Sequence, residues 1–333
     1  MTTILDRPRP AYLDRTFGSI ETNGIRLRAA VQGQGPLIVM IHGFPESWYS
    51  WRHQMLPFAA AGFTACAIDV RGYGGSDRPR DASDYDAQTI TADIAGVIDA
   101  LSPGAPAILI GHDWGAPLAW DTALLYPDRV RAVAGLAVPY LGHGKTPFVD
   151  IMREIFTKRG KFFYQVYFQD EGVAEAEFEA DVRSALRRMY FAGAGEGLGS
   201  WTPDKPADSK MLEGLPDPQP FPAWLTEDDI DYYVDEFERS GFRGPLNRYR
   251  NFERDTAFFA QRADNVLHQP ALFIAGERDL ALNLIPGADL VAMMKRNMSD
   301  LRGVHILPGI GHWTQQEAPE ETTCLLIDWL ATL

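Results

Sequence analysis

Short hydrophobic runs alternate with longer helix-compatible stretches through the first 139 residues of the chain. Runs rich in β-branched and aliphatic residues are typical of strands buried on both faces of a parallel sheet, and we expect four at residues 37–41, 64–70, 107–110 and 130–138. The intervening stretches have the length of crossover helices, at residues 47–61, 87–101 and 116–126. This alternation predicts an α/β fold with an open, mostly parallel, doubly wound sheet.

The pattern changes on either side of this region. Ahead of it, an Asn-Gly turn separates two runs that predict a β-hairpin, at residues 18–21 and 25–31. After Pro139 the strand signal is lost and amphipathic helices follow, which predicts an inserted helical lid. The α/β pattern then resumes with strands at 270–275 and 304–307 and helices at 286–297 and 319–330. We therefore expect a core in two parts around a lid, with limits at residues 1–139, 140–250 and 251–333.

The charge balance narrows the class of partner. The chain has 333 residues, of which 45 are acidic and 31 basic, so its formal net charge is −14. This excess argues against a nucleic-acid partner and against an anionic membrane surface, and it suits a neutral small molecule. The chain has neither a signal-peptide-like apolar core nor an uninterrupted apolar span of about 18 residues, so we expect a cytoplasmic protein.

Cysteine and histidine spacing gives no sign of a bound group. Cys66 and Cys324 lack CxxC spacing and lie among apolar residues, so we expect two buried free thiols. The seven histidines show no metal-ligand spacing, and no GxGxxG motif follows a predicted strand. The sequence therefore predicts neither a metal ion nor a cofactor.

An acid occupies the centre of the segment Gly111-His112-Asp113-Trp114-Gly115, directly after a predicted strand and before a predicted helix. A strand, a tight Gly-flanked turn and a helix form the nucleophile elbow, whose central residue is usually serine. A carboxylate at that position can attack carbon and form an ester that water must then hydrolyse. An isolated Asp of this kind can also simply cap the helix.

Two further residues complete a catalytic set with Asp113. Asp279 follows the predicted strand 270–275, and His312 follows the predicted strand 304–307. Because parallel strands of an open α/β sheet bring their carboxyl ends to one edge, we expect all three side chains to meet there. His312 would take a proton from water, and Asp279 would orient its ring.

The loop after the first predicted parallel strand supplies the remaining part of the catalytic site. In the segment His42-Gly43-Phe44-Pro45, the backbone N–H of Phe44 is expected to form an oxyanion hole with the backbone N–H of Trp114. We interpret His42 as a packing residue, since His312 is better placed to act as a base.

Segments 42–48, 69–76 and 111–115 resemble the soluble epoxide hydrolases of the α/β-hydrolase superfamily. The resemblance extends into the predicted lid, where segments 164–177 and 241–251 are similar to those that carry the two lid tyrosines of that family. It implies an α/β-hydrolase fold, hydrolysis of a small hydrophobic epoxide by water, and Tyr164 and Tyr249 as the tyrosine pair. Tyr167 is the alternative to Tyr164.

Leaving-group chemistry gives the tyrosines a role that fits this resemblance. Opening an epoxide releases an alkoxide, which leaves poorly unless its oxygen receives a hydrogen bond or a proton, and a phenol can provide both.

A haloalkane or haloacid dehalogenase with the same Asp nucleophile is the closest alternative function, although Phe44 lacks the side-chain amide that would help to hold a halide. A non-catalytic small-molecule sensor is the alternative of another class. The sequence gives no expectation for the oligomeric state.

Overall fold

The hydrophobic runs form one eight-stranded sheet, in the order β1-β2-β4-β3-β5-β6-β7-β8. The structure is a computed structural model that describes residues 16–197, 204–283 and 289–333. The strands are β1 (Thr16–Thr22), β2 (Ile25–Gln32), β3 (Leu37–Ile41), β4 (Thr64–Ile68), β5 (Ala107–His112), β6 (Val130–Leu136), β7 (Ala271–Gly276) and β8 (Leu301–Leu307). β2 is antiparallel to β1 and β4, and the other neighbouring strands are parallel.

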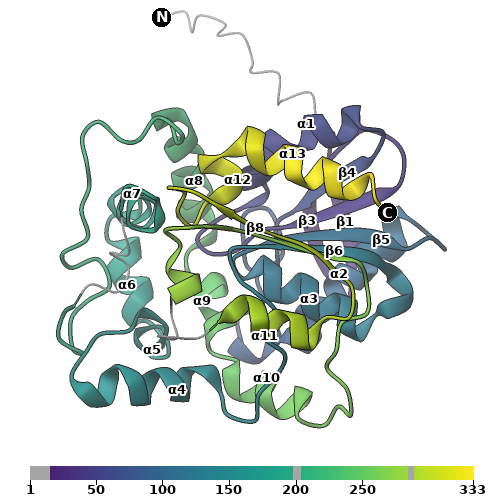
Figure 1. Cartoon of the computed structure of the whole chain (residues 1–333). Helices are drawn as coiled ribbons and strands as arrows, with labels where there is room; N and C mark the ends of the chain where they lie inside the picture. The colour runs from purple at the N-terminus through teal and green to yellow at the C-terminus, as the bar shows by residue number, and fades with distance from the viewer. Residues whose placement is uncertain (1–15, 198–203, 284–288) are drawn as a thin grey trace, which may run out of the picture.

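Helices cover both faces of the sheet (Figure 1). Those that precede or follow the insert are α1 (Arg52–Ala60), α2 (Ala87–Leu101), α3 (Gly115–Leu125), α10 (Phe252–Phe259), α11 (Leu290–Asn297), α12 (Thr314–Glu317) and α13 (Pro319–Leu330). α1 and α13 pack together on one face, whereas α2 and α3 pack together on the other. β3, β5 and β7 are buried along their whole length, which explains their uninterrupted hydrophobic sequences.

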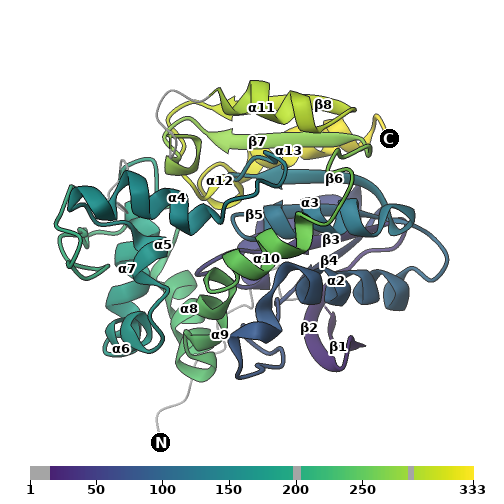
Figure 2. The same ribbon diagram turned by 90° about the horizontal axis from the view of Figure 1, so that it is seen from below.

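Between β6 and β7 the chain forms a group of helices to one side of the sheet (Figure 2). They are α4 (Phe148–Ile155), α5 (Tyr164–Tyr167), α6 (Val173–Glu179), α7 (Val182–Gly193), α8 (Glu227–Ser240) and α9 (Arg243–Tyr249). Thr226 and Asp229 cap the start of α8 reciprocally, because the side chain of each accepts a hydrogen bond from the backbone N–H of the other. Two ion pairs join α8 to the sheet domain, a partly buried one from Arg28 to Glu236 and a buried one from Arg52 to Asp229.

The predicted fold class is confirmed by this sheet and its layers of helices. The elements predicted at 37–41, 87–101 and 319–330 have the same limits in the structure, and the predicted hairpin is the β1–β2 pair. The sixth strand ends at Leu136, two residues before its predicted end, and β8 begins at Leu301, three residues before its predicted start. The first residues of the helix predicted at 286–297 lie outside the described residues.

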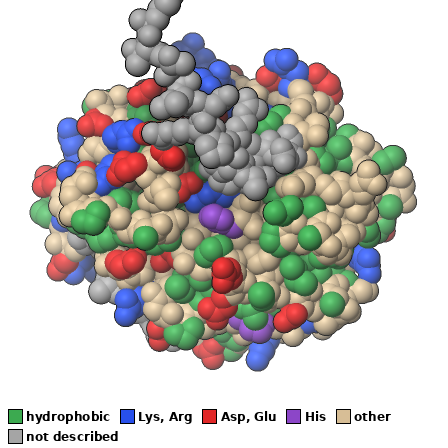
Figure 3. Space-filling view, turned by 90° about the horizontal axis from the view of Figure 1, so that it is seen from above, with side chains coloured by type: hydrophobic (Ala, Val, Ile, Leu, Met, Phe, Trp, Pro, Cys, Tyr) green, Lys and Arg blue, Asp and Glu red, His purple; other side chains and the backbone are tan. Residues whose placement is uncertain are grey.

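The surface mixes hydrophobic, acidic and basic side chains on the face that Figure 3 shows. Among the described residues, no helix is both long enough and apolar enough to cross a membrane. Cys66 is buried in β4, as predicted. The prediction for Cys324 was wrong, because this residue lies on the exposed side of α13, next to the buried Thr322 and Thr323.

Candidate active site

Asp113 lies in a strained turn between β5 and α3. Its backbone φ is 49°, in the left-handed region that residues other than glycine rarely adopt. The turn is also tight, because a Cβ atom at Gly111 would lie 2.0 Å from the carbonyl oxygen of Gly115. Strain of this kind, about 1–3 kcal/mol, is typical of functional positions, and here it presents a carboxylate at the end of a buried strand.

The backbone N–H of Phe44 donates a hydrogen bond to Oδ1 of Asp113, at 2.7 Å. The loop after β3 can approach this closely because the adjacent Gly43 has no Cβ atom. A Cβ atom there would lie 2.3 Å from the same carboxylate oxygen. Trp114, the other predicted member of the oxyanion hole, is the residue after Asp113 and the N-cap of α3. Oδ1 of Asp113 is thus held by the Phe44 amide, which leaves Oδ2 as the other oxygen of the carboxylate.

The structure brings His312 between Asp113 and Asp279. Nε2 of His312 lies 3.4 Å from Oδ2 of Asp113, and Nδ1 lies 3.1 Å from both carboxylate oxygens of Asp279. All three side chains are at least nine-tenths buried as residues, although they follow three different strands. The ring of His312 therefore has one nitrogen oriented by an acid and the other directed at the elbow.

The charges around His312 favour its protonated form. Burial alone would lower the pKa of the imidazole, but the carboxylates of Asp279 and Asp113 outweigh this effect and raise the pKa well above its ordinary value. The raised pKa therefore favours the imidazolium form of His312 between the two acids.

Tyr164 and Tyr249 come from different helices of the insert and lie together near Asp113. Tyr164 begins α5 and Tyr249 ends α9, and their ring centroids are 6.3 Å apart. Tyr249 also packs edge-on against Phe44 and Trp114, at 5.5 and 5.1 Å. The hydroxyl of Tyr164 accepts a hydrogen bond from the side-chain amide of Gln165, at 2.7 Å.

Both phenols remain protonated over the ordinary pH range. Burial raises the pKa of Tyr164 and of Tyr249, and the negative charge of Asp113 raises both further. Tyr167 differs from them, because this half-buried residue donates a hydrogen bond from its hydroxyl to Glu177 of α6, at 2.9 Å. The structure therefore directs Tyr164 towards Asp113 and Tyr167 towards α6.

A cavity of about 300 Å³ opens onto Asp113. Tyr249 is not among its lining residues but contacts two of them, Tyr164 and Trp114. Asp113, Asp279, His312, Tyr164 and Gln165 are among its lining residues. Most of the remaining wall is apolar, with Trp114, Pro117, Val138, Leu141, Phe148, Phe252 and Leu290. Such a cavity suits a small hydrophobic molecule. In the described part of the chain, no group of three or more His, Cys, Asp or Glu side chains could hold a metal ion.

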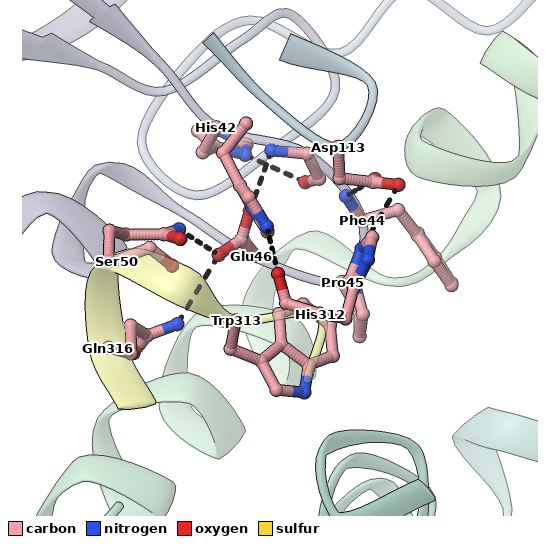
Figure 4. A network of polar contacts seen from close by, with 12 residues as sticks. His42, Phe44, Pro45, Glu46, Ser50, Asp113, His312, Trp313 and Gln316 are labelled. Atoms are coloured by element: carbon pink, nitrogen blue, oxygen red, sulfur yellow. Dashed lines mark hydrogen bonds and ion pairs between the residues drawn. The ribbon is translucent and has the colours of Figure 1, made fainter. Parts of the chain in front are cut away.

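Sequence reasoning missed a buried charge network behind His312 (Figure 4). Glu46 accepts hydrogen bonds at Oε2 from Nδ1 of His112 and from the Gly43 backbone N–H, at 2.7 and 2.9 Å. Nε2 of His112 lies 2.8 Å from the carbonyl oxygen of His312, which can only accept. The ring of His112 therefore donates from Nε2 and links Glu46 to the backbone of His312.

The network keeps Glu46 ionised despite its complete burial. Burial favours the neutral acid, but the charge of His112 and the hydrogen bonds from His112 and Gly43 lower the pKa of Glu46 to about 2. The other oxygen, Oε1, accepts from the side-chain amides of Gln315 and Gln316. A signal was present in the sequence, since Glu46 is a lone acid among the apolar residues that follow β3.

Replacing Glu46 with glutamine is expected to lower the free energy of unfolding by about 3 kcal/mol, because it leaves the buried donors on His112 and Gly43 without a charged acceptor. The glutamine is nearly isosteric, so no cavity contributes to the loss. Urea denaturation measures the change, with Glu238→Gln as the matched control at an exposed position, expected to change stability by less than about 0.5 kcal/mol. Equal stability of the two variants would contradict a role for this network.

Comparisons with known proteins agree with the geometry. Residues 36–319 match the α/β hydrolase fold family. The chain is 39% identical to epoxide hydrolase A of Mycobacterium tuberculosis, over 94% of this chain and 97% of that protein. It is 38% identical to epoxide hydrolase 2 of Siraitia grosvenorii, over 94% and 97% of the two chains. The solved structure of an epoxide hydrolase from an endophytic Streptomyces is 42% identical, covers 95% of each chain and superposes with a TM-score of 0.90. The chain therefore belongs to the epoxide hydrolases of the α/β-hydrolase superfamily.

Proposed function

We propose that this protein converts epoxides into vicinal diols through a covalent ester on Asp113. The observation that carries the proposal is an acid at the nucleophile elbow, with Oδ1 held by the Phe44 amide and Oδ2 3.4 Å from Nε2 of His312. The substrate is a small hydrophobic epoxide, and water is the second reactant. We take residues 140–250 as the lid that closes over it.

In the first step Asp113 opens the ring. Because the Phe44 amide holds Oδ1, Oδ2 is the oxygen that attacks an epoxide carbon, and the carbon–oxygen bond of the ring breaks as the ester bond forms. Tyr164 and Tyr249 donate hydrogen bonds to the departing oxygen. One phenol gives it the proton that makes the first hydroxyl of the diol, and that phenol regains a proton from the one that His312 releases. Their raised pKa values keep them protonated for this task.

In the second step water hydrolyses the ester. His312, oriented by Asp279, takes a proton from water, and the resulting hydroxide attacks Cγ of Asp113. Negative charge develops on Oδ1, where the Phe44 amide already points and where the Trp114 amide completes the oxyanion hole. The bond between Cγ and the ester oxygen then breaks, that oxygen takes the proton of the attacking hydroxyl group and becomes the second hydroxyl of the diol, and the carboxylate is restored with one oxygen from water.

A dehalogenase could use the same three residues, and the leaving group distinguishes the two reactions. A halide leaves as a weak base and is stabilised by N–H donors, whereas an alkoxide requires acidic O–H groups. Phe44 offers no side-chain donor, so the indole N–H of Trp114 lacks a side-chain amide that would hold a halide together with it. Two protonated tyrosines beside Asp113 therefore favour the epoxide.

Turnover of styrene oxide and of 1-bromobutane by the purified protein tests this assignment. We expect diol formation from styrene oxide and no bromide release above that of the Asp113→Ala variant. Steady bromide release without diol formation would assign the site to dehalogenation. If the protein turns over neither 1-bromobutane nor any epoxide of a wider panel, a non-catalytic sensor is the better account.

A further inference from the structure

The cavity has a second polar end, formed by Asp121 and His143, which the reaction does not use. Both residues line the cavity, and Nε2 of His143 lies 2.8 Å from Oδ1 of Asp121. Asp121 is only 4% exposed, so this carboxylate belongs to the interior of the cavity and not to the protein surface. Among the described residues, its second oxygen, Oδ2, has no hydrogen-bond partner.

Helix α3 sets the distance between the two polar ends. Asp121 is eight residues beyond Asp113, and Trp114, Pro117 and Asp121 line the cavity from one side of the helix. At about 1.5 Å per residue, Asp121 is displaced from Asp113 by roughly 12 Å along the helix axis. An extended hydrocarbon chain of roughly ten bonds spans that length.

The wall between the two ends is apolar and suits such a chain. Leu141, Phe148, Phe252 and Leu290 are among the residues that line the cavity. Tyr140 also lines it, but its hydroxyl already donates to the carbonyl oxygen of Asn265 at 2.7 Å. The far end therefore presents the Asp121–His143 pair as its polar feature.

The pair is held rigidly enough to select a ligand. The ring of His143 stacks on Phe259, with centroids 3.5 Å apart and planes within 3°. The preceding Gly142 has φ 74°, and the neighbouring carbonyl of Leu141 accepts from the side-chain amide of Asn297 at 3.0 Å. These contacts fix the segment after β6 against α10 and α11, so the imidazole N–H stays directed at Asp121.

Building on the proposed function, we propose that Asp121 and His143 form a specificity site for epoxides that carry a hydrogen-bond donor, above all a hydroxyl group, about ten bonds from the oxirane. Oδ1 of Asp121 is already occupied by His143, and Oδ2 can only accept a hydrogen bond. A hydroxyl satisfies it, a methyl group leaves it unpaired, and a carboxylate is repelled by it. The pair acts on substrate choice and takes no part in the chemical steps.

A series of matched substrates tests the proposal. The terminal epoxide of undecane is compared with two analogues, in which a hydroxyl replaces the far methyl group or a carboxyl group ends the chain. We expect kcat/KM of the wild-type enzyme to be about tenfold higher for the hydroxyl analogue than for the undecane epoxide, as for one hydrogen bond to a charged group, and lowest for the carboxylate. In the Asp121→Leu variant the hydroxyl analogue should lose this advantage.

Two controls separate specificity from stability. The terminal epoxide of butane is too short to reach Asp121, so its kcat/KM should be the same in the wild type and in Asp121→Leu. Asp128→Leu, at an exposed position soon after α3, should leave every ratio unchanged. If Asp121→Leu does not fold, the wild-type ranking decides the question alone.

Equal kcat/KM for the three long epoxides in the wild type would overturn this inference, and so would a hydroxyl preference that survives in Asp121→Leu. Both results leave the proposed function intact as long as the butane epoxide yields its diol. Failure of the proposed function is a distinct outcome, in which no epoxide yields a diol.

Discussion

Replacing His312 with glutamine is expected to stop the enzyme with its substrate still attached to Asp113. Ring opening needs the carboxylate and the tyrosines, whereas hydrolysis of the ester needs a base, and glutamine cannot take a proton from water. We expect kcat to fall by about 10⁴-fold, the usual scale for loss of a base from such a triad. Intact-protein mass spectrometry should show one added substrate mass per chain.

Two variants serve as controls for the trapped ester. His268 is an exposed histidine, and His268→Gln should turn over at the wild-type rate without an adduct. Asp113→Ala combined with His312→Gln should form no adduct, because it lacks the nucleophile. An unmodified His312→Gln protein, at substrate concentrations that the wild type turns over, would contradict the division of roles between Asp113 and His312.

Loss of both lid hydroxyls is expected to slow ring opening by about 10⁴-fold. One general-acid donor typically contributes about 10²-fold or more, so each single change, Tyr164→Phe or Tyr249→Phe, should cost about 10²-fold because the other phenol still binds the oxygen. Rapid-quench measurement of ester formation in a single turnover isolates this step from hydrolysis. The double variant should show the loss in the ester-formation rate.

Tyr167→Phe is the matched control, since it removes a phenol from the same short helix. Its hydroxyl donates to Glu177, and we expect ring opening at the wild-type rate. Full activity of the double variant would mean that Tyr164 and Tyr249 only pack in the lid. A large loss in Tyr167→Phe with none in Tyr164→Phe would show that the first lid segment was assigned in the wrong register.

Much of the fold is predictable because its signals are local. The strand at 37–41 is a continuous hydrophobic run, and the cap formed by Thr226 and Asp229 lies within four consecutive residues. The pairing of β2 with β4 is different, because no local pattern states which later strand a hairpin will join. Cys324 illustrates a similar limit, since the exposed side of α13 depends on where that helix packs.

The site divides in the same way. Asp113, Asp279 and His312 are predictable because each lies in the loop after a strand, and parallel strands bring their ends together. The histidine partners of Glu46 and Asp121 could not be predicted from the sequence. Glu46 pairs with a histidine that is 66 residues away in the sequence, and Asp121 pairs with a histidine that is 22 residues away.

The position of His312 between two carboxylates has a consequence for timing. In the resting enzyme both negative charges hold a proton on the ring. Once the proposed ester forms, Asp113 is neutral, only Asp279 still favours the imidazolium, and the pKa of His312 falls. The proton that the ring then releases balances the one that the alkoxide takes up, so the net charge of the pocket is the same before and after ring opening. Ester formation thus converts His312 into the neutral form that can act as a base. Water is therefore activated only when an ester is present for it to attack.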